Sequence, residues 1–286
     1  MKVISYNIQF GRGLDAVVDL VRTCRAIRGA DIICLQEVDQ YWQRSGDRDQ
    51  AAEIGGLLPG YYAVYGSSFD VDASAPAAHG AVTNRRRRHG NMILSRWPIL
   101  SMRTLNLPKQ HYADKFNMQM TCIEAVIDTA SMALRIYSYH AGYLGTDERL
   151  EQVDSFAAVF AGSPAEGGAW SGKADIDGDD WSNRRKSPHM PYSAIVCGDF
   201  NAAPDSAEYR SLLDSTGLVD CWSQADPVNR ETSTLRKDVS QDIKVSGKID
   251  HIMVTADLGA RIEQVFIDEK ADGSDHKPIH AVLNLA

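Results

Sequence analysis

The sequence predicts a layered α/β sandwich in which both faces of the sheets are covered. Three observations support this fold class. Strand-like and helix-like segments alternate in the first part of the chain, and strand-like segments dominate the later part. Ala30-Asp31-Ile32-Ile33-Cys34-Leu35 is a short apolar run before a polar residue, which is typical of a strand buried on both faces.

The first elements predict a β-α-β unit, with strand, helix and strand at residues 2–6, 14–28 and 30–35. Within the helix, Leu14, Val17 and Val21 recur on one face, and Gly29 is the expected C-cap. A second helix and a further strand are predicted at residues 49–58 and 61–65.

The later part predicts mainly strands, at residues 92–95, 99–105, 118–127, 134–140, 194–197, 249–254, 261–267 and 279–284. Two helices interrupt them. We expect Thr146 to N-cap the first, and Asp205 or Ser206 to open the second, which Gly217 closes.

The 286 residues are expected to form one domain, covering residues 1–286, because large α/β enzymes fill this length with a single core. Residues 67–89 predict a long surface loop that is rich in Ser, Ala and Asp. Residues 162–191 lack any apolar period and predict an insertion loop. Loops of this length in a compact domain are often functional or disordered.

The charge balance is acidic, with 38 acidic against 30 basic residues and a formal net charge of −8. The chain therefore has no global attraction to nucleic acid or to an anionic membrane, although a local basic face stays compatible with this balance. The run Arg85-Arg86-Arg87-Arg88 has two interpretations: a grip on an anionic substrate, or a solvated charge run.

The five cysteines have no CxxC spacing and apolar neighbours, which predicts buried reduced thiols and no zinc site. The first strand begins almost at Met1, so no signal peptide is expected, and no apolar run approaches the length of a membrane span. These features favour a cytoplasmic protein. The oligomeric state stays open.

Several polar residues lie at the ends of the apolar strands, where α/β proteins tend to place ligands. Each alone has an ordinary explanation as a turn residue, a solvated carboxylate or a core histidine. Their joint placement is harder to explain in that way. These residues are Asn7, Glu37, His140, Asp199, Asn201, Asp275 and His276.

Five motifs, in chain order, resemble those of the endonuclease/exonuclease/phosphatase superfamily. That superfamily includes DNase I-like nucleases, abasic-site endonucleases, neutral sphingomyelinases, deadenylases and inositol polyphosphate phosphatases. The motifs are Tyr6-Asn7-Ile8, Leu35-Gln36-Glu37-Val38, Gly198-Asp199-Phe200-Asn201, Ile249-Asp250-His251-Ile252 and Ser274-Asp275-His276-Lys277-Pro278. No tetrapeptide is specific alone, but the set spans nearly the whole chain. The resemblance implies a DNase I-like fold, a four-layered α/β sandwich of two packed mixed sheets flanked by helices.

The resemblance also implies a metal site. Glu37 would be the principal ligand of Mg²⁺ or Mn²⁺, with Asn7 and Asp275 near the ion. A hard cation held by few carboxylates keeps open positions, and it can neutralise the charge that builds up when a phosphodiester is hydrolysed.

The remaining motif residues are implied to act on the reacting groups. Asp199 would align or deprotonate the attacking water, Asn201 would hold the phosphoryl oxygens, and Asp250 would orient His276. Whether Asp199 or His276 is the base stays open. His140 matches the first histidine of the DNase I and sphingomyelinase branches, where abasic-site endonucleases usually carry tyrosine, so the resemblance favours those branches.

Residues 89–96 resemble a further strand of the family, written roughly G-x-x-I-L-S. Gly90 is expected to allow a close approach of the backbone. His89 and Asn91 either face the substrate or begin a strand.

The leading functional prediction is a divalent-metal-dependent phosphoesterase that hydrolyses a phosphodiester or phosphomonoester by in-line attack of an activated water. The negative net charge mildly favours a small or lipid-like diester. A DNA or RNA endo- or exonuclease of the same superfamily is the alternative, and a non-catalytic binding module is the alternative of another class. A serine or cysteine hydrolase would need a G-x-S-x-G elbow or a Cys-His setting, which the sequence lacks.

Overall fold

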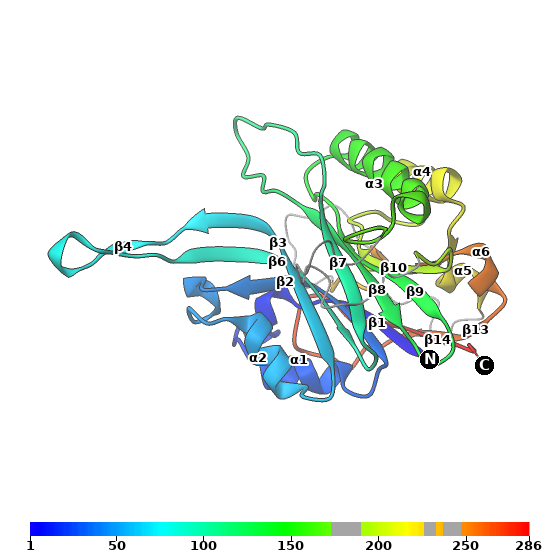
Figure 1. Cartoon of the computed structure of the whole chain (residues 1–286), viewed down its shortest axis with the longest axis horizontal. Helices are drawn as coiled ribbons and strands as arrows, with labels where there is room; N and C mark the ends of the chain where they lie inside the picture. The colour runs from blue at the N-terminus through cyan, green and yellow to red at the C-terminus, as the bar shows by residue number, and fades with distance from the viewer. Residues whose placement is uncertain (173–189, 226–232, 237–246, 286) are drawn as a thin grey trace.

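The computed structural model describes residues 1–172, 190–225, 233–236 and 247–285. Two six-stranded mixed sheets pack face to face, and helices cover their outer faces (Figure 1). The predicted α/β sandwich is therefore confirmed, including the four layers that the family resemblance implies. A separate two-stranded ribbon lies at the end of a long projection.

The first sheet has the strand order β13-β14-β1-β2-β6-β3. Its strands are β1 (Lys2–Asn7), β2 (Ile32–Gln40), β3 (Tyr62–Asp72), β6 (Arg86–Ser95), β13 (Ile262–Ile267) and β14 (Ile279–Leu283). β1 and β2 run parallel, and the other neighbouring pairs are antiparallel.

The second sheet has the order β11-β12-β10-β9-β8-β7. Its strands are β7 (Ile99–Asn106), β8 (Thr121–Asp128), β9 (Ala133–His140), β10 (Ala194–Asp199), β11 (Val219–Asp220) and β12 (Asp250–Val254). Here β9 and β10 form the parallel pair. Each sheet thus places one parallel pair near its centre.

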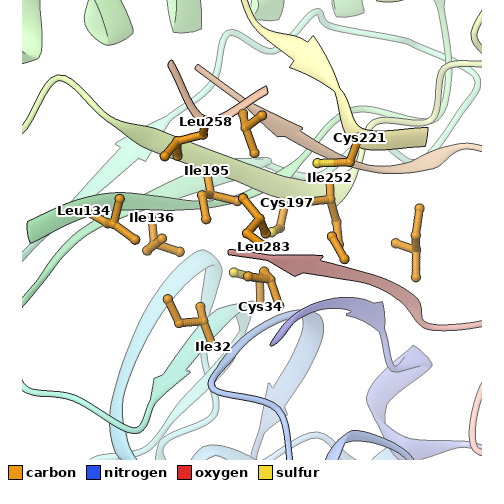
Figure 2. Packing of buried hydrophobic residues seen from close by; sticks show 14 of the residues in the cluster. Ile32, Cys34, Leu134, Ile136, Ile195, Cys197, Cys221, Ile252, Leu258 and Leu283 are labelled. Atoms are coloured by element: carbon orange, nitrogen blue, oxygen red, sulfur yellow. The ribbon is translucent and has the colours of Figure 1, made fainter. Parts of the chain in front are cut away.

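The space between the sheets is filled by apolar side chains (Figure 2). Ile32 and Cys34 of the first sheet face Ile136, Ile195 and Ile252 of the second, and all five are fully buried. Burying one such aliphatic side chain contributes about 1.5–3 kcal/mol. This inner layer holds the two sheets together.

Helices bury the outer faces. α1 (Leu20–Ile27) and α2 (Gln50–Leu57) cover the first sheet, and α3 (Thr146–Glu166) and α4 (Ala207–Thr216) cover the second (Figure 1). Short helices complete the chain at η1 (Gln9–Gly11), η2 (Gln43–Ser45), η3 (Ala78–Gly80), α5 (Cys221–Gln224) and α6 (Ala256–Gly259). Because both faces of the central strands are covered, their sequences are almost continuously apolar.

Two predicted helix starts are wrong and one is confirmed. The helix expected from residue 14 begins at Leu20, because Asp19 caps it by accepting a hydrogen bond from the backbone nitrogen of Arg22. Thr146 is the first residue of α3 and not its N-cap. By contrast, Ser206 caps α4 as expected, and Gly217 closes it in the left-handed region.

The predicted surface loop at residues 67–89 is wrong. β3 and β6 extend into both ends of it as an antiparallel hairpin, which projects from the sandwich (Figure 1) and ends in β4 (Ala75–Pro76) and β5 (Val82–Thr83). Polar residues pair across its strands: Arg86 and Arg88 both form ion pairs with Asp70. The sequence therefore lacks the apolar alternation that predicts a strand.

The predicted insertion at residues 162–191 begins later than expected. α3 continues to Glu166 with Pro164 inside it, and residues 173–189 of the insertion lie outside the described part of the chain.

All five cysteines are buried and unpaired, which confirms the predicted buried thiols. Among the described residues, no helix is both long and apolar enough to cross a membrane.

Candidate active site

The predicted site residues gather at one edge of the sandwich, where the central strands end. Asn7 ends β1, His140 ends β9 and Asp199 ends β10. Asp250 begins β12, which runs antiparallel to β10. The register therefore places His140, Asp199 and Asp250 side by side on three neighbouring strands.

Gly198 brings the end of β10 close to β9. A Cβ atom at this position would lie 1.9 Å from the carbonyl oxygen of Tyr139. No real side chain tolerates that distance, so glycine is required next to Asp199.

Glu37 lies inside β2, and not after a strand as the sequence suggested. The register of β2 against β6 shifts between Leu35 and Val38, so that β2 carries an extra residue there. Glu37 adopts a φ of +60°, in the left-handed region. Such β-bulges turn a side chain out of the regular alternation, often at active sites, and here the side chain is Glu37.

The Asn7 amide links the two sheets. Its Nδ2 donates to Glu37 Oε1 at 2.9 Å and to Asp199 Oδ2 at 3.0 Å, and its Oδ1 accepts from the backbone nitrogen of Gln9 at 3.0 Å. In this orientation Asn7 aligns two carboxylates and uses both ends of a fully buried amide.

His276 pairs with Asp250, its neighbour in space and not in sequence. Its Nδ1 lies 2.9 Å from Asp250 Oδ2, and its backbone nitrogen donates to Ser274 Oγ at 3.1 Å. The other ring nitrogen, Nε2, lies 3.7 Å from Asp199 Oδ2. His140 Nε2 approaches the same oxygen at 3.8 Å, so two imidazoles face one carboxylate.

These groups perturb each other's protonation. Burial, followed by the charge of Asp250, raises the pKa of Asp199 to about 7. Burial opposes charge on His276, but Asp250 and Asp199 outweigh it and raise the pKa of His276 well above its usual value. Burial lowers the pKa of His140 to about 4. A protonated and a neutral imidazole thus flank a carboxyl group that titrates near neutrality.

Asp275 lies on the other side of the site. Its Oδ2 accepts from Gln9 Nε2 at 2.9 Å and its Oδ1 from Ser274 Oγ at 3.2 Å. Ser274 Oγ also donates to the backbone oxygen of Asn7 at 2.8 Å, which ties this segment to β1. Burial, together with the charge of Glu37, raises the pKa of Asp275.

The donor set fits a hard divalent cation. Glu37 and Asp275 are half-buried carboxylates whose negative charges repel one another, a repulsion that a cation would relieve. Carboxylate oxygens are the ligands that Mg²⁺ and Mn²⁺ prefer. Asp199, Asp250 and His276 also offer three atoms within 4.8 Å of one another. Because Asp250 and His276 already bind each other there, that set suits proton transfer better than an ion.

Asn201 is close to Asp199, but its amide is engaged. Its backbone nitrogen donates to Asp199 Oδ1 at 2.9 Å, and its Nδ2 donates to the backbone oxygen of Ala141 at 3.0 Å. Its φ of +47° places it in the left-handed region, which asparagine tolerates well.

Sequence reasoning missed four residues that support the site. Gln9 holds Asp275, Ser274 ties Asp275 to β1, and Asp39 binds His89 at 2.7 Å. Thr234 Oγ1 accepts from the backbone nitrogen of Asp250 at 3.1 Å. Signals existed for Asp39, which follows Glu37 by two residues in an apolar strand, and for Ser274, which begins the motif Ser274-Asp275-His276-Lys277-Pro278.

Two further sequence features have structural roles. Arg85 pairs with Asp47, while Arg87 donates to the backbone oxygen of Tyr41, so the arginine run is bound within the protein. Asn91 is buried and donates across the sheets to the backbone oxygens of Thr121 and Ser138, at 3.1 and 2.8 Å. Its amide nitrogen is therefore engaged within the fold.

The close approach expected at Gly90 is confirmed, because a Cβ there would lie 2.1 Å from the backbone oxygen of Gly66.

Comparison with solved structures gives the same fold. An endonuclease/exonuclease/phosphatase from Bacteroides vulgatus has a TM-score of 0.67 at 17% identity, covering 100% of this chain and 98% of its own. A mannosyl-6-phosphatase from Bacteroides thetaiotaomicron has a TM-score of 0.63 at 15% identity, covering 99% of each chain. A 3′ phosphatase from Neisseria, bound to product DNA hairpin, has a TM-score of 0.59 at 19% identity, covering 99% of each chain.

No curated protein matches the sequence. The sequence model of the Endonuclease/Exonuclease/phosphatase family, however, matches residues 4–276, a span that contains every candidate residue described above. The chain therefore belongs to the Endonuclease/Exonuclease/phosphatase family, whose name states its chemistry, the hydrolysis of phosphoesters.

Proposed function

We propose that the protein hydrolyses a phosphoester with the help of Mg²⁺ or Mn²⁺. One observation carries this proposal: the Asn7 amide joins Glu37 to Asp199, and Asp199 in turn faces His140 and His276. A carboxylate suited to a cation is thus coupled directly to groups that transfer protons and stabilise anions.

Glu37 and Asp275 are the proposed ligands of the cation, and Asn7 lies beside it and aligns Glu37. When bound, the cation supplies a positive charge against the phosphoryl oxygens. Burial raises the pKa of Glu37, but its interactions with His89 and His140 and the Asn7 hydrogen bond outweigh this and lower it overall. Glu37 is therefore ionised at neutral pH, as a ligand has to be.

Asp199 is the proposed base. Its pKa of about 7 is near the optimum for accepting a proton from the attacking water at neutral pH. The raised pKa of His276 keeps its Nε2 protonated, so it is a donor to a phosphoryl oxygen, held in place by Asp250. Because the pKa of Asp199 is near neutrality while His276 stays protonated, Asp199 is favoured over His276 as the base.

His140 and Asn201 are the proposed positioning groups for the phosphoryl group. His140, neutral through burial, can donate one hydrogen bond without adding charge. Asn201 would have to release the backbone oxygen of Ala141 to bind the substrate.

We propose a small or lipid-like phosphodiester as substrate, with a phosphomonoester or a nucleic acid as the alternatives. The ion pairs of Arg85, Arg86 and Arg88 support the small substrate, because these charges are neutralised within the protein and do not form a free basic track. The similar structures include a sugar phosphatase and a phosphatase bound to DNA, so both alternatives belong in the test.

The test measures hydrolysis of a panel of substrates in the presence of Mg²⁺ or Mn²⁺. The panel consists of a bis-aryl phosphodiester, sphingomyelin, inositol phosphates, mannose 6-phosphate, plasmid DNA, an abasic oligonucleotide and a 3′-phosphorylated oligonucleotide. We expect the highest kcat/KM for a small diester, and activity lost in Glu37→Ala. Faster nicking of plasmid would favour the nuclease. Binding of a partner without turnover of any substrate, unchanged by Glu37→Ala and His276→Ala, would favour a non-catalytic module.

We also propose a cytoplasmic location, which the five buried, unpaired cysteines support.

A further inference from the structure

Three aromatic side chains form a continuous row that joins the two sheets. The ring of Trp42 stacks on Phe69, with centroids 5.7 Å apart and an angle of 17° between the rings, and Phe69 meets Phe116 edge-on at 6.0 Å and 79°. Trp42 follows β2 and Phe69 lies in β3, both of the first sheet, whereas Phe116 lies in the connection between β7 and β8 of the second. Ring pairs in these arrangements attract one another beyond the burial of their area. We call these three residues the aromatic row.

One end of the aromatic row lies beside the proposed cation site. The guanidinium group of Arg44 lies over the ring of Trp42, at 4.9 Å from its centroid, and over the ring of Phe10, at 4.5 Å. Phe10 has a φ of +47°, in a region that bulky residues rarely adopt. It follows Gln9, whose side chain donates to Asp275. The stack of side chains therefore continues from the row to the neighbour of a residue that holds a proposed ligand.

The other end of the row lies beside His140. The hydroxyl of Tyr143 donates to the backbone oxygen of Phe116 at 2.6 Å. Tyr143 follows His140 by three residues, and the backbone oxygen of Ala141 between them accepts a hydrogen bond from Asn201 at 3.0 Å. The row thus begins near the carboxylates and ends near the imidazole of His140, so that it borders the groups that act on the phosphoryl group.

The rings at this second end face solvent. Phe116 is 65% exposed and Tyr143 is 38% exposed, while Trp42 and Phe69 are half-buried behind them. Exposed aromatic rings gathered beside polar groups are typical of ligand sites. A row that only fixed the loop to the hairpin would bury its last ring, but here the last ring is the most exposed one.

Two arginines that contact the row are paired within the protein. Arg44 grips Asp39 with two hydrogen bonds, from Nε at 2.9 Å and from Nη2 at 3.0 Å. Arg88, whose backbone oxygen accepts a hydrogen bond from Trp42, forms an ion pair with Asp70. The surface beside the row is therefore suited to an uncharged apolar group and not to the phosphate backbone of a nucleic acid, which would need free cations.

We propose that Phe116 and Tyr143 bind a flat, apolar ester group of the substrate, so that the protein prefers a small phosphodiester that carries an aryl group. This inference rests on the proposed phosphoesterase function and names the substrate class of the same site. Trp42 and Phe69 hold the ring of Phe116 in position from behind. Stacking of a planar group on such a ring strengthens its binding by about 3–10-fold.

Two diesters with one leaving group test this preference. They are phenyl p-nitrophenyl phosphate and methyl p-nitrophenyl phosphate, measured with Mn²⁺. We expect Phe116→Ala to reduce kcat/KM for the phenyl diester by about 3–10-fold more than for the methyl diester, mainly through KM, because the ring binds ground state and transition state alike. Phe116→Tyr keeps the ring and should keep the wild-type ratio of the two kcat/KM values. Equal effects of Phe116→Ala on both diesters would overturn the proposal.

The matched control is Tyr192→Ala. Tyr192 is 67% exposed and precedes β10, at the opposite end of that strand from Asp199. Its removal should leave the ratio of the two kcat/KM values as in the wild type. A change in this ratio as large as that in Phe116→Ala would contradict a specific role for the aromatic row.

Binding without turnover separates this inference from the proposed function. In the background Asp199→Asn, which lacks the proposed base, calorimetry with Mn²⁺ measures the Kd for diphenyl phosphate. We expect Phe116→Ala to weaken this Kd by about 3–10-fold, and an equal Kd overturns the inference. Tighter binding of a dinucleotide than of diphenyl phosphate overturns the choice of an apolar ester group. If the wild type hydrolyses neither diester while the difference in Kd persists, it is the proposed function that fails.

Discussion

His276 holds Asp250 with one ring nitrogen and faces Asp199 with the other. The first distance is 2.9 Å and the second 3.7 Å, and all three side chains are buried. Asp199 and Asp250 are cross-strand partners, so without the imidazole between them two carboxylates would face each other directly. Through this relationship His276 opposes the effect of burial and of Asp250 on the pKa of Asp199.

The variant His276→Asn tests this relationship. The asparagine keeps a donor for Asp250 but lacks the Nε2 donor and the positive charge. We expect kcat to fall about 10²–10³-fold, as when one oxyanion donor is removed. Because His276 lowers the pKa of Asp199, its loss raises that pKa further, and the acidic limb of the kcat/KM profile should move to higher pH.

The pH profiles of both proteins supply the measurement, with His79→Asn, at an exposed position on the hairpin, as the control. An acidic limb that stays in place or moves to lower pH would show that Asp199 is not the base.

Metal removal tests the role of Glu37. We expect exhaustive EDTA treatment to abolish hydrolysis and Mn²⁺ to restore it in the wild type. In Glu37→Gln the missing charge should weaken Mn²⁺ binding by at least the factor of about 10–100 that outer-shell partners contribute. Asp70→Asn, on the hairpin, should bind Mn²⁺ normally. Hydrolysis that persists in EDTA would rule out the metal mechanism.

Gly198→Ala tests how the strands position Asp199. The new Cβ would lie 1.9 Å from the backbone oxygen of Tyr139, and neither strand can move without disturbing the site. We expect the free energy of unfolding to fall by about 3 kcal/mol or more, at the upper end of the cost of overpacking. Urea denaturation measures this change.

The matched control is Gly55→Ala in α2, where a Cβ meets nothing within 4 Å. Alanine there should stabilise the protein by up to about 1 kcal/mol, because it favours the helix. If both substitutions cost the same, the close approach at Gly198 is not what limits that position.

The strand ends could be predicted from the sequence because their signals are local. Asn7, His140 and Asp199 each follow an apolar run, and the sheet register brings them together without further information. The sequence correctly predicts Glu37 at the edge that forms the site, but it wrongly predicts that Glu37 follows the strand. The reason is that a β-bulge has no local signal in an apolar segment.

The supporting residues could not be predicted because their partners are distant in sequence. Asp39 and His89 meet only through the pairing of β2 with β6, and Gln9 meets Asp275 only after the sheet closes. The hairpin could not be predicted for another reason. Its strands are held by charged pairs such as Arg86 with Asp70, so its sequence lacks the apolar periodicity that indicates a strand.

His280 provides a prediction about acid stability away from the site. Its ring is buried, stacks on Phe266 with centroids 4.4 Å apart, and has no hydrogen-bond partner for either nitrogen. Burial, assisted by the charge of Lys2, lowers its pKa from 6.5 to about 3. The unfolded chain therefore takes up a proton that the folded chain refuses, and stability falls as the pH falls from about 6.5 toward 3.

The variant His280→Leu removes this titration while keeping an apolar contact with Phe266. At pH 5 the wild type should have lost on the order of 2 kcal/mol through His280 relative to pH 7.5, and the variant should be spared this part of the loss. Urea denaturation of both proteins at the two pH values measures the difference. An equal loss of stability in both would mean that His280 is protonated in the folded protein, and that the ring is accessible to water.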